Sequence, residues 1–81
     1  MKLLDLTARE KLAAEFLGIP LADAQVNQRD LPEENATYFW EIGRGGGALI
    51  VGKDGRVLFA NSSVAFDVHA DAFARGQRTE T

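Results

Sequence analysis

The sequence predicts an α+β fold: an antiparallel meander of three or four strands, with an N-terminal and a C-terminal helix packed on one of its faces. Three observations support this prediction. Apolar stripes of helical period lie near both ends of the chain, aromatic and β-branched residues gather between them, and an Asp-Gly pair separates two short apolar segments. The 81 residues are expected to form one domain, 1–81, around a small core.

The first helix is expected at about residues 7–17. Thr7 and Glu10 match a capping box, in which the Thr7 hydroxyl accepts a hydrogen bond from the amide of Glu10 and the Glu10 carboxylate accepts one from the amide of Thr7. An apolar stripe of helical period follows, made of Leu12, Ala13, Phe16 and Leu17. Gly18 fits a left-handed cap at the end of this helix, and Pro20 is expected to prevent the helix from resuming.

Four strands are expected after this helix. Residues 24–28 alternate in polarity and predict a short edge strand, and residues 31–35 predict a polar turn after it. Residues 37–42 form the clearest strand, because they are dense in aromatic and β-branched side chains. Residues 48–51 and 56–60 are expected to be the last two strands, which places three consecutive strands in a meander.

A hairpin turn is predicted between the last two strands. Asp54 and Gly55 occupy the two central positions that a type I′ turn selects. With a two-residue turn, the expected register pairs Lys53 with Arg56, Val51 with Leu58, and Leu49 with Ala60.

The second helix is expected to begin between Ser63 and Asp67, either of which is a suitable cap, and to end near Ala74 or Arg75. Its apolar stripe consists of Phe66, Ala70 and Phe73. Gly76 is expected to terminate it. The polar tail, residues 77–81, is expected to be frayed.

Both faces of the sheet are predicted to be apolar. If Ile42 pairs with Ala48, one face carries Tyr38, Trp40, Ile42, Ile50, Val57 and Phe59, and the other carries Phe39, Leu49, Val51 and Leu58. Two short helices cover one face only, so we expect the second set to form an exposed patch that binds another protein. A different register would exchange the residues between the faces but would leave both faces apolar.

The glycine-rich segment Gly43–Gly47 is expected to connect two strands. A phosphate-binding loop needs the pattern G-x-x-x-x-G-K-[ST] and a helix directly after it. Here a strand follows the glycines, which favours a wide hairpin connection in which glycine accepts positive φ without strain. The alternative is a flexible contact loop in which Arg44 supplies the one cation.

No catalytic, cofactor or metal site is predicted. The chain has one histidine and no cysteine, whereas a zinc site takes three or four nitrogen or sulfur ligands. His69 is two residues from both Asp67 and Asp71, so it points away from them on a helix and is expected to be a partly buried structural residue. Ser62 and Ser63 are accounted for as turn and cap residues rather than nucleophiles.

Composition and charge argue against several further classes of protein. The net charge is −3 and no basic run is present, which argues against a nucleic-acid partner. The apolar segments are too short to cross a membrane, and Asp5 interrupts the first of them too early for a signal peptide. Together with the absence of cysteine, these features predict a cytoplasmic protein.

The segment Ala48–Val57, with the aromatic strand Tyr38-Phe39-Trp40 and the helices on either side, resembles the YrhB-like (immunity protein 35-like) family. That family has a W-x-F strand and an xIVDK-x-G-x-V hairpin, and this chain has Gly52 at the usual acidic position. The resemblance spans residues 7–75, and PepSY-type and cystatin-like modules share its α-β-β-β order. It implies a bacterial immunity protein that neutralises a toxin by binding it, and it assigns no toxin-contact residue.

The sequence therefore predicts a non-enzymatic protein-binding module. The partner is expected to be a toxin or a second copy of the chain. The predicted contact residues are Phe39, Leu49, Val51 and Leu58 on the sheet, with Arg44 in the glycine-rich segment. The alternative is a small-ligand-binding or regulatory domain that uses Gly43–Gly47.

Overall fold

The computed structural model describes residues 4–41, 47–61 and 63–79. Its strands are β1 (Gln28–Leu31), β2 (Ala36–Trp40), β3 (Gly47–Gly52) and β4 (Val57–Asn61), which form one antiparallel sheet in the order β1-β2-β3-β4. Its helices are α1 (Leu6–Leu17), α2 (Leu21–Val26), the short 3-10 helix η1 (Pro32–Glu34) and α3 (Phe66–Ala74). The predicted α+β class and the antiparallel meander are confirmed.

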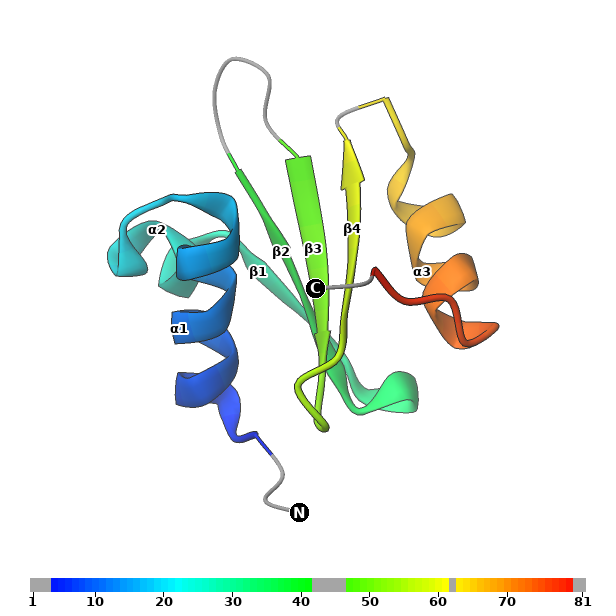
Figure 1. Cartoon of the computed structure of the whole chain (residues 1–81), viewed down its shortest axis with the longest axis horizontal. Helices are drawn as coiled ribbons and strands as arrows, with labels where there is room; N and C mark the ends of the chain where they lie inside the picture. The colour runs from blue at the N-terminus through cyan, green and yellow to red at the C-terminus, as the bar shows by residue number, and fades with distance from the viewer. Residues whose placement is uncertain (1–3, 42–46, 62, 80–81) are drawn as a thin grey trace.

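The helices lie on both faces of the sheet, so the prediction that they share one face is wrong. Figure 1 shows α1 and α2 on one side of the strands and α3 on the other. On the first side, Ala13 of α1 and Ala24 of α2 pack with Leu49. On the second side, Phe73 of α3 packs with Ile50. All six residues of β3 are therefore buried between two helical layers.

The turn between β3 and β4 also differs from the predicted one, and it changes which residues of β4 face which helices. Gly55 has a φ of 84°, its amide donates to the Gly52 carbonyl over 3.1 Å, and the Gly52 amide donates to the Arg56 carbonyl over 2.9 Å. The loop thus has three residues with glycine in the left-handed position, instead of the two-residue type I′ turn. The register pairs Val51 with Val57, Ile50 with Leu58, and Leu49 with Phe59. A slip of one residue exchanges the faces of a whole strand.

Three of the four sheet residues in the predicted contact patch are therefore not on the surface of this protein. Phe39, Leu49 and Val51 are completely buried beneath α1 and α2. Leu58 is half-buried and lies on the opposite face, against the Phe73 cluster. Arg44 lies outside the described residues, as do Ile42 and the glycine-rich segment up to Gly46, and Gly47 is the first residue of β3.

The first helix begins on a different cap from the predicted one. The side chain of Asp5 accepts from the Ala8 amide over 2.8 Å, in place of Thr7. Glu10 is only 8% exposed and accepts from Gln28 Nε2 over 2.6 Å, which ties α1 to the first residue of β1. Gly18 ends the helix with a φ of 69°, as expected.

The segment after Gly18 contains a second helix that the sequence did not predict. Pro20 stands at the N-cap of α2 rather than blocking a helix, because proline lacks only an amide that the first turn leaves unbonded in any case. The strand predicted at residues 24–28 is wrong except at its last residue, because residues 24–26 belong to α2 and the edge strand β1 begins at Gln28. The polar turn is confirmed as η1, and Asn35 closes it with a φ of 51°.

The tail is held in place up to Thr79, so the expectation of fraying is wrong for residues 77–79. Thr79 donates its amide to the Val57 carbonyl over 2.7 Å, and its hydroxyl accepts from the Phe59 amide over 2.8 Å. Arg78 lies over the Phe73 ring at 3.6 Å from the ring centroid. The tail therefore covers part of the outer edge of β4. Gly76, at a φ of 96°, ends α3 as predicted.

The three-residue turn makes a testable prediction about Gly55. Its positive φ penalises any residue with a Cβ, although the nearest atom to that Cβ, Leu4 Cδ1 at 3.6 Å, leaves room for it. We expect Gly55→Ala to lower the free energy of unfolding by about 1–2 kcal/mol. Gly55→Asn should cost less, since asparagine tolerates the left-handed region. Urea denaturation measures both, and equal losses would contradict the assigned turn.

Candidate functional site

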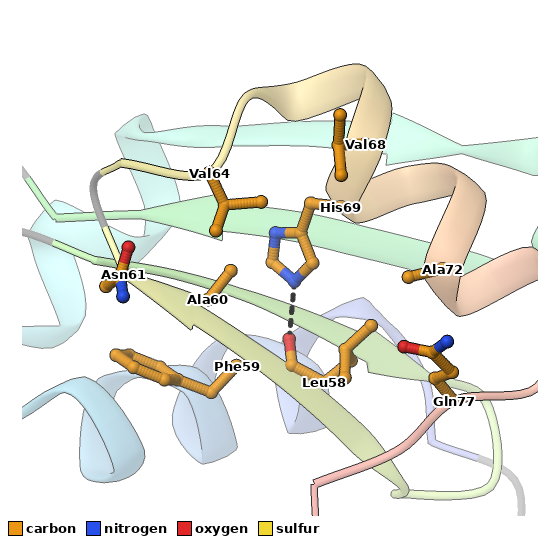
Figure 2. A pocket seen from close by; sticks show the side chains of 9 residues that line it. All are labelled: Leu58, Phe59, Ala60, Asn61, Val64, Val68, His69, Ala72 and Gln77. Carbon is orange, nitrogen blue, oxygen red and sulfur yellow. Dashed lines mark hydrogen bonds between the residues drawn. The ribbon is translucent and has the colours of Figure 1, made fainter.

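A hollow of about 360 Å³ lies between β4 and α3. Figure 2 shows the side chains that line it: Leu58, Phe59, Ala60, Asn61, Val64, Val68, His69, Ala72 and Gln77. None of these nine is Asp, Glu, Lys or Arg, although such residues make up 26% of the chain. The hollow is thus uncharged and mainly apolar, with two amide side chains among its lining.

The local sequence accounts for this hollow. Leu58 and Ala60 alternate along β4 on the side that faces α3. On α3, Val68 and Ala72 are four residues apart and lie on one helical face. Because Ala60 and Ala72 each contribute only a methyl group, strand and helix leave space between them.

His69 is the one ionisable residue of the lining. It is 2% exposed, and its Nε2 lies 2.7 Å from the carbonyl oxygen of Leu58 (Figure 2). A carbonyl oxygen only accepts, so Nε2 carries the proton and Nδ1 is left as an acceptor. Nδ1 is buried, and no described residue donates to it. His69 is therefore a buried structural histidine, as expected, but with one nitrogen unpaired.

Burial sets the charge state of this histidine. It lowers the pKa of His69 below the ordinary value of 6.5, and the hydrogen bond to Leu58 opposes that shift less strongly. The imidazole and the Tyr38 ring also form a T-shaped contact, with centroids 5.6 Å apart and planes at 73°. The neutral imidazole is the form that fits the site at pH 7.

Exposed apolar side chains border the hollow. Val68 on α3 is 58% exposed and Phe59 on β4 is 41% exposed. The Phe59 ring lies against Gly47, where an added Cβ would be 2.7 Å from Phe59 Cε1, and its centroid is 5.9 Å from that of Phe16 on α1. We call Phe16, Phe59 and Val68 the apolar rim. It extends from the hollow around the edge strand to the other side of the sheet.

A second hollow of about 350 Å³ lies between α3 and the β1–η1 segment, and it differs in character. Its lining includes Asp30, Glu33, Glu34 and Asp71, with the Arg29 guanidinium 4.5 Å from the centroid of the Phe66 ring. Within residues 4–41, 47–61 and 63–79, no group of three or more histidine, aspartate or glutamate side chains is arranged to hold a metal ion.

The serines do not form a nucleophile with His69 in the described part of the chain. The Ser63 hydroxyl and amide both bond to the side-chain oxygen of Asn61, and Ser62 lies outside the described residues. No helix of the described segments has the length and apolar character that crossing a membrane requires.

Of the contact residues predicted from the sequence, Leu58 lines this hollow; His69 was expected only as a structural residue, and Phe59 was assigned to the wrong face. The register slip hid the rest, because it moved Leu58 away from α3. The pair Ala60 and Ala72 was the one available signal, since small residues on two packed elements leave space between them.

The chain matches none of the known proteins with which it was compared. No family model, no curated protein and no solved structure aligns with it at a significant level.

The buried imidazole predicts a pH dependence of stability. Because the unfolded chain binds a proton near pH 6.5 and the folded chain only at lower pH, the contribution of His69 is complete above about 6.5 and declines below it. We expect the wild-type Tm to fall between pH 7.5 and pH 5.5. His69→Gln, which keeps a donor for Leu58 and has no charge, should start from a lower Tm and fall less. Parallel curves for the two proteins would contradict the assignment.

Proposed function

We propose that this protein is a non-enzymatic binding domain whose partner is another protein, and that it docks through the hollow between β4 and α3. One observation carries the proposal: a concave surface without any charged lining residue is bordered by the exposed apolar rim. Depletion of charge at the centre and exposed aromatic side chains distinguish protein interfaces from the remaining surface. Apolar patches of this kind on a small soluble domain commonly mark contact sites.

The position of the hollow supports docking at the edge of the sheet. Thr79 occupies the outer edge of β4 at Val57 and Phe59, so the partner meets the portion toward Asn61 together with α3. Phe59 belongs both to the hollow and to the contact with Phe16 on the other side of the sheet. A partner that covers the rim would therefore contact both helical layers.

The proposed class of partner comes from the resemblance of the sequence to the YrhB-like immunity-protein family. An immunity-type protein would bind a toxin, and a toxin gene beside this one would add support. A second copy of the chain is the competing partner, and the two differ in oligomeric state. The alternative of a ligand-binding loop at Gly43–Gly47 concerns residues of which only Gly47 is described, and it stays a prediction.

Val68 provides the sharpest test of the docking surface. Its side chain is exposed at the rim, so Val68→Glu adds a charge there without emptying a core position. We expect this variant to weaken binding of the purified partner at least about tenfold, as expected for a contact worth 1.4 kcal/mol. Calorimetric titration measures Kd, and circular dichroism checks that the variant is folded.

Val26→Glu is the matched control. Val26 ends α2, is 77% exposed and lies on the other side of the sheet. The same substitution there should leave Kd unchanged. Partner binding that both variants retain would contradict the assigned surface. Sedimentation tests the competing partner: a dimer that Val68→Glu dissociates identifies a second copy, and a monomer excludes it.

A further inference from the structure

We propose that the hollow between β4 and α3 receives one aromatic side chain of the protein partner, a tyrosine or a tryptophan, whose O–H or N–H donates to Nδ1 of His69. This inference rests on the proposed function and names the group that the docking surface recognises. Three features of the hollow support it: its size, its lack of charge and the unpaired buried nitrogen.

The size of the hollow suits a ring. Its volume is about 360 Å³, and a cavity of roughly 150 Å³ is enough to hold benzene. The lining offers methyl and methylene surface from Leu58, Ala60 and Ala72, with Phe59 at the rim. Aromatic side chains bury a large apolar area with little loss of rotational freedom, which is why they dominate the energetically important contacts at interfaces.

The unpaired nitrogen selects among aromatic rings. Nδ1 of His69 accepts only, because Nε2 already carries the proton that it donates to Leu58. A phenylalanine would leave Nδ1 unpaired, and a carboxylate would place two acceptors together. The charge of a lysine or an arginine would have no carboxylate in the lining to pair with. A neutral ring with a single donor meets all of these requirements.

We expect Val64 to control access to this nitrogen. Figure 2 shows the second ring nitrogen on the side of Val64, away from the Leu58 carbonyl. Nδ1 is covered in this arrangement, so the donor reaches it when the Val64 side chain turns aside. Val64 precedes α3 and lies outside the helices and strands. Replacement by alanine should open the path.

The test uses side-chain analogues as probes. NMR titration of the full chain at pH 7.5 compares p-cresol and 3-methylindole, which carry a donor, with toluene, which does not. We expect the donor-bearing rings to bind about tenfold tighter than toluene, the factor that one net hydrogen bond supplies. We also expect them, and not toluene, to shift the ¹⁵N resonance of His69 Nδ1. Val64→Ala should increase the affinity for p-cresol.

Two alanines of α3 provide a matched pair of variants. Ala72→Leu places a larger side chain in the hollow and should abolish binding of all three probes and of the purified partner. Ala74→Leu makes the same change on α3 at a residue that lines the other hollow, and it should abolish neither. Leucine is close to alanine in helix propensity, so neither variant is expected to unfold the chain.

The outcomes separate this inference from the proposed function. Equal affinity for p-cresol and toluene, an unmoved Nδ1 resonance, or no binding of any probe overturns the inference. In that case the Val68→Glu measurement alone still tests the proposed docking surface. If Ala72→Leu blocks the probes but leaves partner affinity unchanged, the hollow binds a free small molecule, and the assignment to a partner side chain is wrong. A partner complex that reproduces the Nδ1 shift supports it.

Discussion

The structure depends on the turn between β3 and β4. Because Gly55 adopts a left-handed conformation and Gly52 bonds to Arg56 across three residues, β4 is offset by one position from the register that a two-residue turn would impose. That offset places Leu58 and Ala60 toward α3 and Phe59 toward α1. The register of β4 therefore decides which of its side chains line the hollow beside α3 and which pack toward α1.

The sheet is covered on both faces by a chain of only 81 residues. Each helical layer is thin, and the core divides into one cluster beneath α1 and α2 and a smaller one beneath α3. Both clusters bury β3. On the α3 side, β4 at the edge is covered only by the nine residues of α3 and by the tail. The incomplete cover at this edge creates the hollow. The small size of the cluster beneath α3 and the hollow beside β4 therefore have the same cause, which is the thin helical layer on this side of the sheet.

His69 couples the stability of the second cluster to the chemistry of the hollow. Its bond to Leu58 joins α3 to β4, and burial keeps the ring neutral by lowering its pKa. An unpaired buried acceptor costs free energy, and a binding partner that supplies the missing donor recovers that cost. His69 thus stabilises the isolated domain through Nε2, and its unpaired Nδ1 is the atom at which a partner adds free energy to the complex.

The sequence by itself determined the elements: the two outer helices with their glycine ends, the polar turn, the aromatic strand and the antiparallel order. Each of these depends on interactions between near neighbours along the chain. It also indicated that His69 is structural, since helical spacing separates it from the aspartates. Only the tertiary structure decided the face of β4, the side on which α3 packs and the existence of the hollow. The reason is that Asp-Gly fits two hairpin turns that differ by one residue, and which of them forms depends on how Leu49, Phe59 and the helices pack together.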